Sequence, residues 1–73
     1  MAVKFRHIET GLFFCRAKGL SPTIREINEA GGSHAIFLKR NLSKRGRIYE
    51  SATEKQKRNW IGEYADEFEI VEV

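Results

Sequence analysis

Apolar residues in this chain never run for more than four positions, and this limits the fold to short elements with one apolar face. The two longest runs are Leu12–Cys15 and Ala35–Leu38, whereas a helix needs about 20 apolar residues to cross a bilayer. Lys4 and Arg6 interrupt the amino-terminal stretch that a secretory signal would keep apolar. We therefore expect no membrane span and no signal peptide. We expect residues 1–73 to form a single domain, because 73 residues leave no room for two cores.

The amino-terminal segment has the pattern of a β-hairpin. Residues 3–8 alternate apolar and polar side chains, residues 9–11 contain a turn glycine, and residues 12–16 begin with an apolar run. Strict alternation is typical of a strand with one buried face. Because neighbouring strand residues face opposite sides, one of the rings of Phe13 and Phe14 should point into the core and the other outward.

A first helix is predicted over residues 22–30. Ser21 suits the N-cap position, Pro22 suits the first helical position, and the glycines at residues 31–32 suit the end of a helix. The helix would be short, with one apolar face.

A second hairpin is predicted after these glycines. Residues 34–39 and 47–50 both have strand composition, and residues 41–46 between them are largely polar and basic. This arrangement predicts two paired strands joined by a basic tip.

A second helix is predicted to begin near Ser51. Ser51 and Glu54 fit the capping box, in which each side chain bonds a backbone amide of the other residue. The apolar stripe of this helix would consist of Trp60, Ile61 and Tyr64. Gly62 interrupts the stripe and should weaken the end of the helix.

The chain closes with a strand pattern at residues 68–73. Phe68 and Ile70 share one face, and Val71 and Val73 share the other. Together the segments predict an α+β fold, namely a small, mostly antiparallel sheet with two short helices on one face, in the order ββαββαβ. The last strand is expected at an edge of the sheet.

Charge is distributed unevenly along the chain. Residues 39–58 hold eight basic and two acidic side chains, a local charge of +6, and residues 63–73 hold five acidic side chains and no basic one. The basic stretch can neutralise nucleic-acid phosphates, with Tyr49 and Trp60 as candidate stacking platforms. It can equally meet an acidic protein surface, or remain a solvated hairpin tip. We interpret the acidic tail as solubility charges, with mimicry or repulsion of nucleic acid as the alternative.

Two groups of basic residues are candidate contacts, on the basis of charge and expected exposure. The first group lies on the amino-terminal hairpin and consists of Lys4, Arg6 and Arg16. The second group lies in the basic stretch and consists of Lys39, Arg40, Lys44, Arg45 and Arg47.

Catalytic and metal-binding signals are weak. Cys15 lies in an apolar run, which is typical of a small core residue, and a single cysteine cannot form an intrachain disulfide and indicates a reducing, intracellular site. Cys15 and His7 lie on the two arms of the first hairpin, but no third group that would orient them is evident. His7 and His34 lack the closely spaced partners that zinc needs, and no phosphate-binding glycine motif occurs. The sequence predicts no cofactor, no metal site and no enzyme activity.

The carboxyl-terminal half carries a resemblance to known proteins. Residues 44–49, Thr53 and Lys55 at the start of a helix, and residues 66–71 follow a pattern seen in small phage early proteins. In length, charge and overall character the chain resembles small phage-encoded regulators that bind host bacterial RNA polymerase, such as the transcription inhibitor and antiterminator of a lytic Xanthomonas phage.

The resemblance implies a non-catalytic role in the cytoplasm of the host bacterial cell. It implies inhibition of promoter initiation and antitermination at intrinsic terminators. The implied partners are the beta-prime amino-terminal region of the polymerase, NusA, and RNA near the exit channel. On charge alone, we assign the first basic group to the polymerase and the second to RNA or a second acidic surface.

Other functions remain open at this stage. A small basic module could bind DNA or RNA directly, and it would then show a steep dependence of affinity on salt. A small nuclease is the third alternative, although the sequence offers no set of paired acids and metal ligands for one. The sequence does not determine the oligomeric state.

Overall fold

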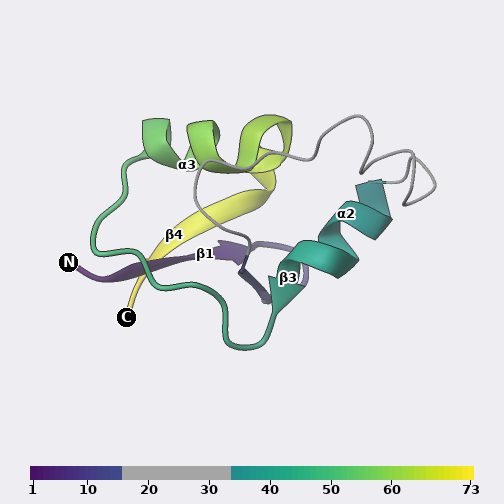
Figure 1. Cartoon of the computed structure of the whole chain (residues 1–73), viewed down its shortest axis with the longest axis horizontal. Coiled ribbons are helices and arrows are strands. Elements are labelled where there is room, and N and C mark those ends of the chain that lie inside the picture. Colours follow the sequence, from purple (N-terminus) through teal and green to yellow (C-terminus); the bar gives the residue numbers. More distant parts are fainter. Residues whose placement is uncertain (16–33) are drawn as a thin grey trace.

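A small antiparallel sheet with helices packed against it forms the part of the chain that the computed structural model describes, residues 1–15 and 34–73 (Figure 1). The elements in chain order are β1 (Val3–His7), β2 (Phe13–Phe14), α2 (His34–Asn41), β3 (Leu42–Ser43), α3 (Glu54–Ile61), the 3-10 helix η1 (Gly62–Glu67) and β4 (Phe68–Glu72). The strands are arranged in the order β3-β2-β1-β4, and all neighbours are antiparallel. The expected α+β class is confirmed, whereas the predicted order of elements is wrong in the middle of the chain.

β1 and β4 form the longest pairing in the sheet. Their register runs from Val3 opposite Glu72 to His7 opposite Phe68. Alternation in β1 works as predicted, because Val3, Phe5 and His7 are buried while Arg6 is exposed. β4 lies at an edge of the sheet, as expected.

The amino-terminal hairpin is also confirmed. β1 pairs with β2 through Arg6 and Phe13, and Gly11 in the turn has a φ of +73°. Phe14 is fully buried, and Phe13, on the opposite face, is half-buried. One ring therefore points into the core and the other outward.

The core lies between the sheet and α3, which runs along the upper edge of Figure 1. The ring of Phe5 contacts the rings of Tyr49 and Trp60 at centroid distances of 4.8 and 5.8 Å. Phe14 meets Phe68 edge-on at 5.8 Å. The buried apolar residues are Val3, Phe5, Phe14, Phe37, Tyr49, Trp60, Ile61, Ala65 and Phe68.

The strand predicted at residues 34–39 is wrong, because this segment begins the helix α2. A short apolar run fits a buried strand and a buried helix equally well by periodicity. The tertiary contacts select the helix. Phe37 and Asn41, four residues apart, are both buried, while Lys39 and Arg40 between them are exposed. The side-chain amide of Asn41 donates to the carbonyl of Phe37 at 2.8 Å and completes the last turn.

The second hairpin with a basic tip is also wrong. β3 pairs with β2 instead, with Leu42 opposite Phe14. Of residues 47–50, Tyr49 alone forms a bridge, and its partner is Val3. The helix predicted over residues 22–30 lies outside the described residues.

The second predicted helix is present, with a later start. Thr53, not Ser51, is the N-cap: its side chain accepts from the amide of Gln56, and the Gln56 side chain accepts from the amide of Thr53. Both pairs have the Ser/Thr-x-x-Glu/Gln spacing, so the pattern alone does not choose between them. α3 ends at Gly62, whose φ is +78°, and the chain continues as η1.

Candidate binding surface

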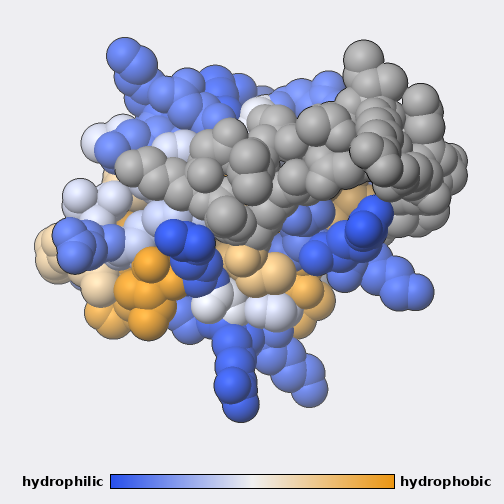
Figure 2. Space-filling model, viewed as in Figure 1, coloured by the Kyte–Doolittle hydropathy of each residue, from blue (hydrophilic) through white to orange (hydrophobic). Residues whose placement is uncertain are grey.

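Five exposed cations lie close together in sequence, from the end of α2 to the segment after β3, and we call them the basic surface. They are Lys39, Arg40, Lys44, Arg45 and Arg47. The segment after β3 runs along the lower edge of Figure 1, on the other side of the sheet from α3. Figure 2 shows long hydrophilic side chains projecting from that lower edge.

Lys4 joins the basic surface, although the sequence placed it in the other group. Its ammonium group donates to the backbone carbonyl of Arg45 and lies 5.0 Å from the centre of the Phe13 ring. Lys4 thus covers the outward-pointing ring of β2 and connects β1 to the segment after β3.

The basic segment is fixed to the sheet at Gly46. The amide of Gly46 donates to the hydroxyl of Ser43 at 2.8 Å. Gly46 has a φ of +67°, and a Cβ at this position would lie 2.2 Å from the Cβ of Phe13. The adjacent Arg47 amide donates to the carbonyl of Phe14 at 2.9 Å. The backbone that carries Lys44, Arg45 and Arg47 is therefore held directly against β2.

Arg6 faces the same side of the sheet as Lys4 but has a different partner. Its Nε lies 2.6 Å from Oε1 of Glu69, the residue opposite it in β4. Both side chains are partly exposed. Arg16, the third member of the first predicted group, lies outside the described residues.

The aromatic rings near the basic surface belong to the core. Tyr49 and Trp60 are 6% and 7% exposed, and they stack on each other at 4.8 Å with an angle of 21°. Burial raises the pKa of Tyr49, against the opposing effect of the nearby Arg47 cation. The prediction that these rings are open stacking platforms is wrong. A pocket of about 320 Å³ is lined by Arg47, Glu50 and Gln56 as well as by Tyr49 and Trp60.

Charge pairing distinguishes three other cations of the described chain from the basic surface. Lys57 pairs with Glu54 at 2.8 Å, Arg58 pairs with Asp66 at 2.5 Å, and Arg6 pairs with Glu69. The Arg58 guanidinium lowers the pKa of Asp66 by a hydrogen bond and by its charge. Within residues 1–15 and 34–73, in contrast, no carboxylate forms an ion pair with any of the five cations of the basic surface.

Lys57 belongs to the fold, although the sequence counts it with the basic stretch. It is 5% exposed, and its ammonium group donates to the carbonyl of Phe68 at 2.7 Å. Its position three residues before Trp60 on α3 is the signal that could have placed it on the buried face.

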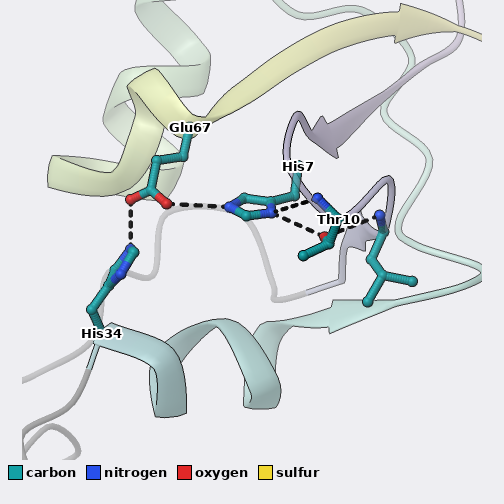
Figure 3. A network of polar contacts seen from close by, with 5 residues as sticks. His7, Thr10, His34 and Glu67 are labelled. Carbon is teal, nitrogen blue, oxygen red and sulfur yellow. Dashed lines mark hydrogen bonds and ion pairs between the residues drawn. The ribbon is translucent and has the colours of Figure 1, made fainter.

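A polar network that the sequence did not reveal joins three elements (Figure 3). Glu67 at the end of η1 lies between two imidazoles: its Oε1 is 3.2 Å from Nε2 of His7, and its Oε2 is 2.5 Å from Nε2 of His34. Alternation in β1 could have indicated that His7 points inward. Its partner lies 60 residues away, and no local pattern indicates such a contact.

The network does not have the arrangement of a metal site. The two imidazoles point at different oxygens of the carboxylate and not at a common point. The part of the chain in view contains no group of three metal-ligating side chains close enough to hold an ion.

Cys15 differs from its predicted core position. It is exposed just after β2, and its amide and thiol both donate to the carbonyl of Asn41, at 2.9 and 3.0 Å. The apolar run before it ends at Phe14, which takes the buried position. No helix among the described elements is both long and apolar enough to cross a membrane.

Comparisons of the chain with protein-family models, curated proteins and solved structures gave no match.

Proposed function

We propose that this protein is a non-catalytic phage regulator that binds host RNA polymerase, inhibits promoter initiation and promotes antitermination. The observation that carries the proposal is that, within residues 1–15 and 34–73, no carboxylate pairs with the cations of the basic surface. Arg6, Lys57 and Arg58 are paired with carboxylates inside the described structure. In contrast, Lys44, Arg45 and Arg47 of the basic surface lie on a backbone segment that is fixed to β2. Fixed, unpaired charge is suited to an acidic partner, because it steers encounter and sets orientation.

The burial of the aromatic rings favours a protein partner. Proteins that bind single-stranded nucleic acid combine a basic groove with exposed aromatic rings on which bases stack. Here Tyr49 and Trp60 form part of the core, so the exposed chemistry of this region is mainly cationic.

The proposed contact residues are chosen by their charge and exposure. Lys4 and Arg6 on β1 are the proposed contacts with the polymerase, in the beta-prime amino-terminal region, and Arg16 completes this group by sequence. Arg6 must exchange its pairing with Glu69 for a partner carboxylate, whereas Lys4 sits beside Arg45 and can act with the basic surface. The basic surface itself would face RNA near the exit channel or a second acidic surface, with NusA as a further partner. The site of action is the cytoplasm of the host cell.

Direct binding to DNA or RNA is the second candidate function. It is supported by the spacing of Lys44, Arg45 and Arg47, three exposed cations within four residues. Such a cluster can neutralise several phosphates, and each neutralised phosphate steepens the dependence of affinity on salt.

The test is a pull-down of host lysate with the tagged protein, with and without nuclease. The proposal predicts that RNA polymerase subunits are retained and survive nuclease. Loss of all retained material on nuclease treatment would favour direct nucleic-acid binding and overturn the polymerase proposal.

Charge reversal then tests the basic surface itself. Lys44→Glu combined with Arg45→Glu should weaken polymerase retention and antitermination, because both side chains are exposed and unpaired in the described chain. The matched control compares two single variants, Lys44→Glu and Lys55→Glu. Lys55 is also an exposed cation with no carboxylate partner in the described chain, but it lies on α3, on the other side of the sheet. Equal losses in these two single variants would show that net charge matters and the basic surface does not.

A further inference from the structure

The start of α2 is attached to η1 by two stacked rings and one polar contact. The imidazole of His34 stacks on the ring of Tyr64 at 4.7 Å and 28°. Phe37, one turn later, stacks on the same ring at 4.3 Å and 22°. Nε2 of His34 also lies 2.5 Å from Oε2 of Glu67. The other end of α2 continues directly into β3, so the two ends of this helix are held in different ways.

His7 holds the Glu67 carboxylate in place (Figure 3). The amide of Thr10 donates to Nδ1 of His7 at 3.4 Å, and the hydroxyl of Thr10 lies 2.9 Å from the same nitrogen. Because Nδ1 accepts, the ring hydrogen is on Nε2, which donates to Oε1 of Glu67. This is the pattern of a neutral imidazole. His7 therefore orients the carboxylate and leaves its negative charge available to His34.

His34 can change its charge at this position, since its side chain is 46% exposed to solvent. Imidazoles titrate within the physiological range. The groups that face His34 from the packed elements are Tyr64 and Glu67 of η1, with His7 of β1 behind the carboxylate and Glu63 beside Tyr64. Burial, together with the neighbouring Glu63, raises the pKa of Tyr64, so its hydroxyl stays neutral while the imidazole titrates.

We propose that His34 and Glu67 form a pH-sensitive clasp that docks the start of α2 onto η1. When His34 is protonated, its positive charge pairs with the carboxylate and the helix is held at its first residue. When His34 loses its proton, the charge attraction is lost, and only a hydrogen bond between neutral groups and the ring stacking remain. Loss of the proton from His34 therefore loosens the first turn of α2.

Because His34 is the first residue of α2, the direction in which acid changes the docking of this helix can be tested. The N-terminal end of a helix disfavours a positive charge, because the backbone amides there are exposed and partly positive. A protonated His34 is therefore favourable at this position only while Glu67 compensates. Without the carboxylate, acid should loosen α2 instead of tightening it.

The clasp also bears on binding. Lys39 and Arg40, two members of the basic surface, lie at the far end of the same eight-residue helix. A change in the docking of α2 would move these two cations relative to Lys44 and Arg45. This consequence rests on the proposed function, whereas the clasp itself does not.

The experiment is an NMR titration of the whole ¹⁵N-labelled protein, alone in solution, between about pH 5 and pH 8. In the unaltered protein, the amides of Phe37 and Leu38 and the ring protons of Tyr64 should shift in one transition that coincides with the titration of the His34 ring. In Glu67→Gln the amides of α2 should lose order towards low pH, the reverse of the unaltered protein. Glu63→Gln, the matched control, removes an equal charge from η1 and should keep the original response.

Two results would overturn the clasp. One is an α2 that does not respond while His34 titrates, and the other is a Glu67→Gln variant with the same response as the unaltered protein. If Glu67→Gln does not fold because His7 loses its partner, His34→Gln replaces it as the test. That substitution is at an exposed position, and it should abolish the transition in α2 while the β1 amides keep their positions. Because no polymerase or nucleic acid is present, failure here leaves the proposed function standing.

Discussion

The carboxyl-terminal elements α3, η1 and β4, together with β1, use charge differently from the basic segment at residues 39–47. Arg6 of β1 pairs with Glu69 of β4, and Arg58 of α3 pairs with Asp66 of η1. In the basic segment five cations have no carboxylate partner among the described residues. Pairing inside the molecule occupies Asp66 and Glu69 of the acidic tail and leaves the positive charge of the basic segment exposed. We infer that charge in the first region serves the fold and charge in the second serves a partner.

The two regions also differ in how their backbones are held. β1 and β4 are held by a ladder of strand pairs, whereas the part of the basic segment after β3 is held by single contacts at Arg45, Gly46 and Arg47. Those contacts connect the two regions, and the following substitutions test the connection and the contrast.

The largest loss of stability is expected at Gly46. Gly46→Ala should cost about 1–2 kcal/mol for a left-handed backbone and about 1–3 kcal/mol more for overpacking against Phe13. Urea unfolding measures the loss. Gly11→Ala is the control, because Gly11 has a φ of +73° with no described heavy atom near the added Cβ. Equal losses at both glycines would mean that the basic segment is not held on Phe13.

A smaller loss is expected when the buried lysine is replaced. Lys57→Met removes the bond to the carbonyl of Phe68 and leaves that carbonyl without its donor, which should cost about 1–3 kcal/mol in the free energy of unfolding. Lys55→Met, at an exposed position two residues earlier on α3, should stay within about 0.5 kcal/mol of the unaltered protein. Similar values for the two variants would contradict the structural role of Lys57.

The pair of Arg58 and Asp66 should give a small effect that depends on pH. The pKa of Asp66 is lowered in the fold from its ordinary value of 3.8. Its contribution to stability is therefore present above that ordinary value and is lost as pH falls through the lowered one. Asp66→Asn should reduce the melting temperature slightly at neutral pH and leave it unchanged in strong acid. Glu72→Gln, at an exposed position on β4, should lack this dependence, and a matching pH profile would argue against the pair.

The smallest change in stability is expected in the basic surface. Lys44→Gln combined with Arg45→Gln should keep the free energy of unfolding within about 0.5 kcal/mol of its original value, because these side chains have no partner carboxylate in the described chain. The backbone carbonyl that Lys4 bonds is retained in the variant. A loss as large as that of Lys57→Met would break the contrast between the two regions.

Local patterns in the sequence predicted the elements that depend on local chemistry. Alternation located β1 and placed Phe5 on the buried face, and Gly62 marked the end of α3. Two patterns failed because each allowed two answers. The run at residues 34–39 fits a strand or a helix, and the helix start fits a cap at Ser51 or at Thr53.

The candidate site was less predictable than the fold. Lys44, Arg45 and Arg47 are exposed, as expected for a stretch with many basic and few acidic residues. The burial of Lys57 and the pairing of Arg6 with Glu69 depend on neighbours 11 and 63 residues away. Contacts at such separations follow from strand register, which the sequence pattern alone did not establish.

The pairing of β1 with β4 has a consequence for the timing of folding. Arg6 and Glu69 lie 63 residues apart, so β1 is synthesised early and must wait for its longest partner until β4 has left the ribosome. Non-local pairing of this kind slows folding, because a large loop must close before the contacts form. Until then β1 lacks its longest strand partner, and its apolar face has only β2 and the rings of Tyr49 and Trp60 to pack against among the described residues. We expect the nascent chain to acquire its core in one late step, with the cations of the basic surface exposed on an unfolded chain before that step.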